Sequence, residues 1–278
     1  MPDYLNADYD HNSAELVEVF DELPLWAAPF GLKLLDHIRY RKGIMALDVG
    51  FGAGFPLTEL AMRLDQHSKV YGIDPWEPAV ARAEKKIACY GISNVEIIRG
   101  VAEFIPLPDE SIDLIVSNNG LNNVQNISEA LRECNRVMKP EGQFVQTMNL
   151  EGSMSEFYTS LEKVLIDTGQ QELVEAMNAQ IHQLRKPLDE YLMLIESHGF
   201  SIESVIHDEF QYRFVDATTM FNHYFIRMAF LDGWKSIVPG DRQAEVFTRV
   251  EKLLNEQAEA TGSLTLTIPF VLIDGKKA

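Results

Sequence analysis

Closely spaced glycines follow an acidic residue in the first part of the chain. The segment 46–55 reads A-L-D-V-G-F-G-A-G-F, so Asp48 precedes Gly50, Gly52 and Gly54. Because glycine has no Cβ, such a loop can adopt positive φ values and let a ligand lie directly against the backbone. A carboxylate beside that backbone favours a ligand with a positive charge, such as an ammonium or a sulfonium. The alternative interpretation is a tight turn between a strand and a helix.

The spacing of these glycines differs from that of a nicotinamide dinucleotide site. Such a site follows the pattern G-x-G-x-x-G, which would place its third glycine at position 55, where this chain has Phe55. Asp48 would also oppose a pyrophosphate at the start of the following helix. The loop therefore favours a ligand of the S-adenosylmethionine type over NAD.

A second acidic residue stands at the end of the next apolar segment, which reads G-I-D-P-W over residues 72–76. Asp74 lies about twenty residues after the glycine loop, where a carboxylate can accept hydrogen bonds from both hydroxyls of a ribose. Pro75 and Trp76 follow it, and Trp76 could pack against an adenine ring. The alternative role for such an acid is a helix cap.

Several asparagines cluster at the end of a later apolar segment, where residues 117–123 read S-N-N-G-L-N-N. Open parallel sheets bind ligands at the carboxyl ends of their strands. Asn118 or Asn119 could contact the methionyl group of a bound ligand while its neighbour orients an acceptor. A polar turn is an equally good interpretation, because asparagine tolerates left-handed conformations and bonds its own backbone.

Short segments rich in valine and isoleucine alternate with segments of helical spacing, which predicts an α/β fold with a parallel sheet. Helix boundaries are marked by Pro78, by Ser128 with Glu129 as a cap, by Gly91 and by the turn 139–142. The predicted strands are 44–49, 69–73, 95–98, 112–117, 143–148, 200–210 and 263–273. The predicted helical regions are 55–64, 77–89, 128–138, 151–185, 187–197 and 211–262.

Four motifs in this order resemble the core of class I S-adenosylmethionine-dependent methyltransferases. They read LDVGFGAG, YGIDPW, GVAEFIPLPDESID over residues 100–113, and RVMKPEGQF before the fifth predicted strand. The run 47–150 is similar to methyltransferase type 11 domains and to ubiquinone and menaquinone biosynthesis enzymes. The resemblance implies S-adenosyl-L-methionine as cofactor, with S-adenosyl-L-homocysteine as product.

The resemblance also assigns positions around that cofactor. It implies that Ala102 and Glu103 lie at the adenine edge and that Asp74 binds the ribose diol. The family usually has an acidic residue where this chain has Val101, so we expect Glu103 or a backbone carbonyl to replace it. The residues implied around the methionyl and ribose end are Asp48, Gly50, Phe51, Gly52 and Gly54.

The family topology is a seven-stranded Rossmann-like sheet of order 3-2-1-4-5-7-6, with strand 7 antiparallel. In that topology the insertions 151–185 and 211–262 leave the sheet above the cofactor, so we expect them to form a helical lid on a methyltransferase domain of residues 41–278. Residues 1–40 are expected to form a helical cover. Its apolar residues have helical spacing, and Tyr4 and Tyr9 lie on its first arm; the apolar residues are Leu16, Val17, Phe20, Leu23, Trp26, Phe30, Leu34 and Leu35.

The second insertion contains the candidates for a catalytic base. His223 and Tyr224 lie in an aromatic segment, and an imidazole can accept a proton near neutral pH. A structural histidine is the alternative. We expect no metal site, because in the segment His207-Asp208-Glu209 strand alternation places only the first and third residues on one face.

The composition restricts the acceptor. The net charge of −18, from 42 acidic and 24 basic residues, disfavours nucleic acid. Two cysteines and a start without a secretion signal predict a cytoplasmic protein, and no apolar run is long enough to insert into a membrane. We therefore expect O-, N- or C-methylation of a small molecule. A non-catalytic S-adenosylmethionine-binding module, or an enzyme that uses the same cofactor for cyclisation or decarboxylation, remains as an alternative, and the sequence leaves the oligomeric state open.

Overall fold

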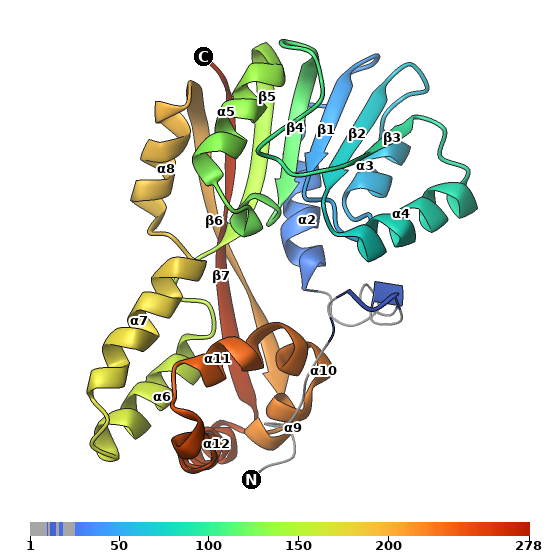
Figure 1. The fold of residues 1–278 in the computed structure, drawn as a ribbon. Helices are drawn as coiled ribbons and strands as arrows, with labels where there is room; N and C mark the ends of the chain where they lie inside the picture. Colours follow the sequence, from blue (N-terminus) through green and yellow to red (C-terminus); the bar gives the residue numbers. More distant parts are fainter. Residues whose placement is uncertain (1–9, 11, 15–16, 19–25) are drawn as a thin grey trace. The chain divides into compact units, whose positions relative to one another are not determined.

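The computed structural model describes residues 10, 12–14, 17–18 and 26–278, and within them a seven-stranded sheet organises the chain (Figure 1). The strands are β1 (Met45–Val49), β2 (Lys69–Asp74), β3 (Val95–Arg99), β4 (Ile112–Asn118), β5 (Met138–Asn149), β6 (Phe200–Phe214) and β7 (Leu264–Lys277). Their order is β3-β2-β1-β4-β5-β7-β6. The pairs β1–β2, β1–β4, β2–β3 and β4–β5 are parallel, and β5–β7 is antiparallel. The predicted fold class and strand order are confirmed.

Helices follow the strands as the apolar spacing predicted. They are α2 (Ala27–Asp36), α3 (Leu57–Arg63), α4 (Glu77–Tyr90), α5 (Ile127–Val137), α6 (Ser155–Asp167), α7 (Glu172–Leu184), α8 (Leu188–Ser197), α9 (Ala217–Asn222), α10 (Tyr224–Ile226), α11 (Asp232–Ser236) and α12 (Gly240–Thr261), with a 3-10 turn at Leu121–Asn123 and a π-helical turn at Arg227–Leu231. Among the described residues, no helix is both long enough and apolar enough to cross a membrane.

The chain divides into two compact units. The sheet unit holds the described residues of 11–149 together with Leu188–Asp208 and Phe270–Ala278, and therefore β1 to β5 with part of β6 and β7. The helical unit holds Leu150–Pro187 and Glu209–Pro269, together with the described residue Asp10. Both predicted insertions thus belong to one unit.

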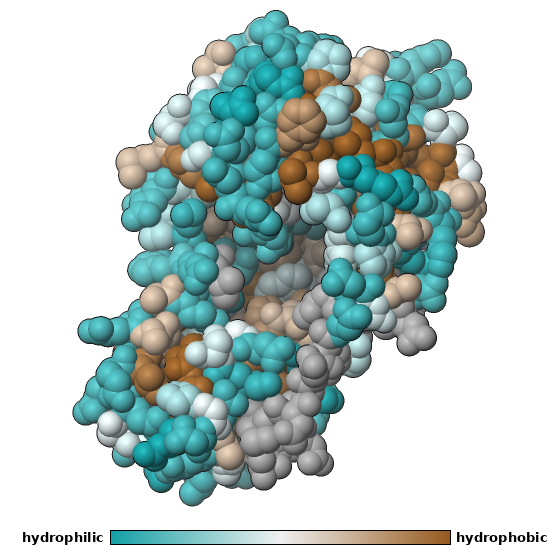
Figure 2. Space-filling model, in the orientation of Figure 1, coloured by the Kyte–Doolittle hydropathy of each residue, from teal (hydrophilic) through white to brown (hydrophobic). Residues whose placement is uncertain are grey.

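The core of the sheet unit forms where apolar faces of α2, α3 and α4 pack on the strands. Leu34, Leu60 and Val80 come from these helices and are fully buried against strand residues such as Val70 and Val116. Burial of aliphatic side chains of this size stabilises the fold by about 1.5–3 kcal/mol each. Figure 2 shows one face of the molecule as largely hydrophilic, with hydrophobic residues in its upper part and a smaller group in its lower part.

The helical unit has its own aromatic core. Phe157 of α6 stacks on Trp234 of α11 with ring centroids 3.8 Å apart, and Phe221 meets both rings edge to face. Phe247 of α12 packs edge to face against Phe221. These side chains are buried, and their ring contacts join α6, α9, α11 and α12 of this unit.

Several predicted boundaries were wrong, and the reasons are local. The segment 139–142, predicted as a turn between elements, lies inside β5: Met138 pairs with Ile112 and Gln143 with Leu114, so the intervening residues bulge out of the ladder. The cap of α5 is Asn126, whose side chain accepts the Glu129 N–H at 3.2 Å, rather than Ser128. β6 and β7 extend beyond the predicted 210 and 273.

The N-terminal prediction is tested only in part. Val17, Phe30, Leu34 and Leu35 are buried as expected, and Trp26 is half-buried. Tyr4, Tyr9, Leu16, Phe20 and Leu23 lie outside the described residues.

Candidate functional site

The loop after β1 contains glycines because the backbone there adopts positive φ values and lies too close to a neighbouring loop for a side chain at position 50. Gly50, Gly52 and Gly54 have φ values of 77°, 54° and 108°, which favour glycine. A Cβ on Gly50 would lie 2.5 Å from the Cα of Gly120, and a Cβ on Gly120 would lie 2.1 Å from the carbonyl oxygen of Val49. The loops after β1 and β4 therefore touch backbone to backbone.

The position of Gly52 is open. A Cβ there would have nothing within 4 Å, although the residue takes a left-handed conformation. The loop is held by neighbouring groups instead: the Gly50 N–H donates to the carbonyl of Ile73 at 2.9 Å, and the Gly52 N–H donates to Asp74 Oδ2 at 2.8 Å. Bare backbone thus faces free space at the point where the sequence predicted that a ligand lies.

Asp74, at the end of β2, links this loop to the next one. Its Oδ1 accepts the Trp76 N–H at 2.8 Å while Oδ2 accepts from Gly52. Each carboxylate oxygen has a second lone pair, so both remain able to accept from a ribose diol. Burial raises the pKa of Asp74, whereas the amides of Trp76 and Gly52 lower it.

Asp48 is fully buried in β1, and neither carboxylate oxygen has a partner at hydrogen-bonding distance and angle; the backbone of Leu57 interacts with it only weakly. Burial raises the pKa of Asp48 well above its usual range, the charge of Asp74 raises it further, and the backbone of Leu57 lowers it. Buried carboxylates are normally paired or hydrogen-bonded. An unpaired one beside an open glycine loop fits a ligand that brings a positive charge.

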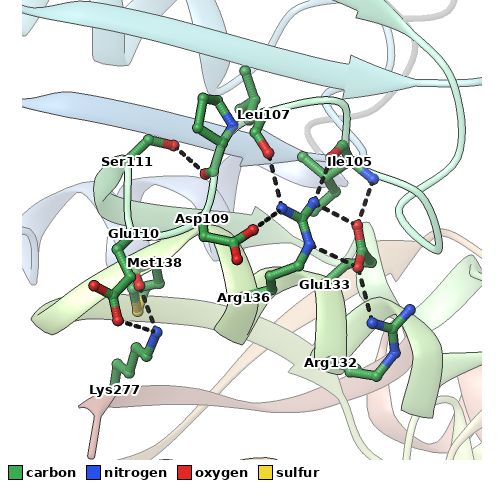
Figure 3. A network of polar contacts seen from close by, with 11 residues as sticks. Ile105, Leu107, Asp109, Glu110, Ser111, Arg132, Glu133, Arg136, Met138 and Lys277 are labelled. Atoms are coloured by element: carbon green, nitrogen blue, oxygen red, sulfur yellow. Dashed lines mark hydrogen bonds and ion pairs between the residues drawn. The ribbon is translucent and has the colours of Figure 1, made fainter.

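The loop 100–111 carries the predicted adenine-edge residues, and a polar network fixes it (Figure 3). Arg136 of α5 donates to the carbonyls of Ile105 at 2.7 Å and Leu107 at 2.9 Å, and pairs with Asp109 at 2.6 Å. Glu133 pairs with Arg136 at 2.7 Å and accepts the Ile105 N–H at 3.0 Å. Arg136 lowers the pKa of Glu133. The loop is therefore held from α5.

The structure places the three residues of this loop that were predicted to lie at or near the adenine edge. Ala102 is buried. Glu103 Oε1 accepts the Asn126 N–H at 2.9 Å, which ties the loop to the start of α5. Val101, at the position where the family usually has an acid, is exposed.

The two asparagines after β4 have structural roles. Asn118 is buried, donates to the Ala27 carbonyl at 3.1 Å and accepts from Thr147 Oγ1 at 2.9 Å, which joins α2 to β5. Asn119 has a φ of 59° and accepts from Asn122 Nδ2 at 3.0 Å. Such bonds are expected of a polar turn, and they do not test the predicted contact with a ligand.

The remaining predicted cofactor residues are Phe51, Pro75 and Trp76, and they differ in how far their side chains are buried. Phe51 is buried in the core of the sheet unit and packs against Gly72, so its backbone rather than its ring lies along the loop. Pro75 is exposed and Trp76 is half-buried.

The catalytic candidates lie in the helical unit. His223 packs edge to face against Tyr212 and Phe214, and its buried Nδ1 has no hydrogen-bond partner. Burial lowers the pKa of His223, so the ring is neutral at pH 7. Tyr224 is partly exposed.

Sequence reasoning missed two residues that shape the site. Gly120 makes the close backbone contact with Gly50 described above. Ser117 Oγ donates to the Val49 carbonyl at 2.9 Å and accepts the Leu121 N–H at 3.0 Å. The S-N-N-G pattern was noted for its asparagines, but its first and last residues join β1 to β4.

The chain matches a known family over this site. Residues 47–146 fit the family described as a methyltransferase domain. Residues 47–146 are a methyltransferase domain, similar to those of class I, S-adenosylmethionine-dependent methyltransferases. The matched residues of this methyltransferase domain include the glycine loop, Asp74 and the loop fixed by Arg136. S-adenosylmethionine is the cofactor of the domain, and the unpaired Asp48 beside open backbone suits its positive charge.

A curated relative supports this assignment over part of the chain. The demethylmenaquinone methyltransferase of Geobacillus stearothermophilus is 35% identical over 116 residues, which are 38% of this chain and 50% of that protein. The chain spans about half the length of the curated relatives it matches.

Solved structures share the fold of the methyltransferase domain. The YcgJ protein of Bacillus subtilis has a TM-score of 0.58 at 20% identity, over 90% of this chain and 98% of that one. The geranyl diphosphate C-methyltransferase of Streptomyces coelicolor A3(2), in complex with S-adenosyl-L-homocysteine, has a TM-score of 0.56 at 16% identity, over 99% and 87%. At these identities the likeness concerns the fold.

Proposed function

We propose that the protein transfers the methyl group of S-adenosylmethionine to a small-molecule acceptor. The observation that carries the proposal is the unpaired, buried Asp48 beside the open glycine loop that Asp74 holds. When bound, the cofactor supplies an electrophilic methyl group on a sulfonium. The chain's own contribution is to hold the cofactor and the acceptor in line, which can supply about 7–11 kcal/mol.

Each polar group of the sheet unit has a part in this arrangement. Asp48 stabilises the cationic end of the cofactor, and the free lone pairs of Asp74 accept from the ribose hydroxyls. The bare backbone at Gly52 allows close approach, and Ala102 and Glu103 border the adenine. Pro75, Trp76, Asn118 and Asn119 complete the surroundings of the cofactor through their positions at the ends of β2 and β4.

We assign acceptor binding to the helical unit, which the insertions after β5 and β6 form. The aromatic side chains of this unit suit a partly apolar acceptor, and the net charge of −18 disfavours a polyanionic nucleic acid. The relative is named for demethylmenaquinone and the fold neighbour for geranyl diphosphate, and both names agree with an acceptor that has an apolar part. Residues 1–40, of which 26–40 are described continuously, stay the predicted helical cover.

His223 is the proposed base where the acceptor must lose a proton. Its imidazole is neutral at pH 7 because burial lowers its pKa, and its Nδ1 has no hydrogen-bond partner. Tyr224 follows it directly in sequence and is the second candidate. An acceptor that carries no such proton needs only positioning.

Calorimetry and a metabolite screen test this function. S-adenosylmethionine and S-adenosylhomocysteine should both release or absorb heat on binding, and ligand at about 100 times Kd should add about 2.7 kcal/mol of stability. Incubation with S-adenosylmethionine and a metabolite extract should then yield a product heavier by one CH2. Folded protein without binding heat contradicts the proposal, and binding without any methylated product supports a non-catalytic cofactor-binding module instead.

A further inference from the structure

The helical unit contains a buried arginine that the cofactor site does not use. Arg185 follows the last residue of α7, and only 3% of its surface is exposed. Its backbone N–H donates to the Ile181 carbonyl at 2.8 Å. Its side-chain Nε and Nη1 are buried without a hydrogen-bond partner.

The groups around Arg185 leave its donors unused. The guanidinium carbon lies 5.9 Å from the centroid of the Tyr158 ring, which is within reach of a cation–π contact. The Tyr158 hydroxyl is itself occupied, because it donates to Gln180 Oε1 and accepts from Trp234 Nε1, both at 3.2 Å.

Two acidic side chains of this unit contact groups other than Arg185. Glu151 Oε1 lies 2.5 Å from Nδ1 of His182 in the last turn of α7, although this buried oxygen accepts no hydrogen bond. Glu156 accepts from the backbone and hydroxyl of Thr267. Within the described chain, no ion pair is found for Arg185.

This arrangement is unfavourable unless something else binds there. A guanidinium stays charged at any physiological pH, and a buried charge without a partner is more costly than most other defects in a core. Its planar set of N–H donors matches carboxylates and phosphates with two parallel hydrogen bonds. Among the described residues no carboxylate forms an ion pair with this guanidinium, so an external oxyanion fits.

We propose that Arg185 binds an oxyanion, a carboxylate or a phosphate, on the acceptor molecule. The inference rests on the proposed function, because it names the chemical class of that acceptor. Tyr158 beneath the guanidinium and the adjoining Trp234 ring favour an apolar body attached to the anionic group. In a chain of net charge −18 a dedicated cation is required to hold an anion against the general repulsion.

Binding of small anions tests the assignment without knowledge of the acceptor. We would titrate wild-type protein with phenylacetate, phenyl phosphate and the neutral 2-phenylethanol, and follow tryptophan fluorescence, to which Trp234 contributes. At least one anion should bind tighter than the alcohol, and Arg185→Gln should weaken it more than tenfold while affinity for the alcohol is unchanged. The stronger of the two anions identifies carboxylate or phosphate as the group. Equal anion affinity in Arg185→Gln, or no saturable response to either anion, overturns the proposal.

Stability gives an independent readout. Arg185→Leu should raise the Tm of the ligand-free protein by at least about 2 °C, because it removes an unpaired buried charge. Arg242→Gln is the matched control, since Arg242 is an exposed arginine of the same unit, and it should change neither Tm nor anion binding. A lower Tm for Arg185→Leu would show that Arg185 is a paired structural residue and would contradict the proposal.

Cofactor binding separates this proposal from the proposed function. Arg185→Gln should bind S-adenosylhomocysteine in the calorimeter as the wild type does, because Arg185 belongs to the helical unit and Asp48 and Asp74 to the sheet unit. Wild-type protein that binds the anions but not the cofactor would reject the methyl-transfer function alone. Protein that binds the cofactor but no anion would reject the role of Arg185 alone.

Discussion

The backbone N–H of Gly52 donates to Asp74 Oδ2 at 2.8 Å. The same carboxylate that we assign to the ribose therefore also sets the conformation of the glycine loop in the absence of ligand. Loop shape and ribose recognition depend on one side chain, which makes Asp74 the most sensitive position of the site.

Asp74→Ala should weaken S-adenosylhomocysteine more than tenfold and lower the free energy of unfolding by about 1–3 kcal/mol, because two backbone N–H groups lose their acceptor. Calorimetry and urea unfolding measure the two effects. Asp189→Ala, at an exposed site in the first turn of α8, serves as control and should change stability by about 0.5 kcal/mol or less. Unchanged affinity in Asp74→Ala would contradict the ribose assignment.

Gly50→Ala and Gly52→Ala should differ in kind. A Cβ at position 50 would meet the Cα of Gly120 at 2.5 Å, and neither backbone can move easily, so we expect poor folding. A Cβ at position 52 meets nothing, so this variant should fold with a strain of about 1–2 kcal/mol but lose cofactor affinity. Circular dichroism and calorimetry separate the outcomes, and full cofactor affinity in Gly52→Ala would show that the ligand lies elsewhere.

The elements of the sheet unit could be predicted because each is encoded locally. Glycine spacing, strand-end acids and apolar periodicity all lie within short segments, and they located the strands and the glycine loop. The strand order came from the family resemblance. The roles of Asn118 and Glu103 could not be read in this way. Their partners, Ala27 and Asn126, are far away in the sequence or belong to another element, and only the folded chain brings them together.

In the helical unit, too, the local pattern predicted the elements but not the contacts between them. Its aromatic residues were correctly expected to form mainly core, since Phe221 and Trp234 are buried. Arg185 carried no sequence signal, because a single basic residue after a helix is ordinary. Its burial without a partner depends on the packing of Tyr158 and Trp234, which periodicity does not specify.

Asp48→Asn should stabilise the ligand-free protein and weaken cofactor binding. Since the folded pKa of Asp48 lies above its unfolded value, the folded state holds its proton more tightly. The contribution of Asp48 to stability therefore falls as pH rises from about 4 through the raised pKa. Urea unfolding at several pH values should show a smaller decline in Asp48→Asn than in wild type. An identical decline in both would place the unfavourable charge at another residue.

The pKa of His223 is shifted in the direction opposite to that of Asp48, so its effect on stability has the opposite pH dependence. Its folded pKa lies below its unfolded value because the imidazole is buried. The associated stability is fully present above about pH 6.5 and is lost as pH falls through the folded pKa. His223→Gln should reduce this acid sensitivity between pH 7 and 5, measured by thermal unfolding, and His67→Gln at an exposed site should not. Once an acceptor is known, a base role predicts that the acidic limb of the rate profile disappears in His223→Gln.

Arg136→Met should disturb the site from a distance. The side chain holds two carbonyls of the 100–111 loop, and its removal leaves Glu133, which is 5% exposed, without its main partner (Figure 3). Loss of one member of such a buried pair costs about 3 kcal/mol. Cofactor binding should also weaken, because the loop that loses its support carries Ala102 and Glu103.

Arg132→Gln is the matched control. Arg132 also contacts Glu133, at 3.1 Å, but is itself mostly exposed, so its loss should cost about 1 kcal/mol or less. Urea unfolding and calorimetry on both variants measure the difference, and equal effects would show that the two arginines support the loop equally.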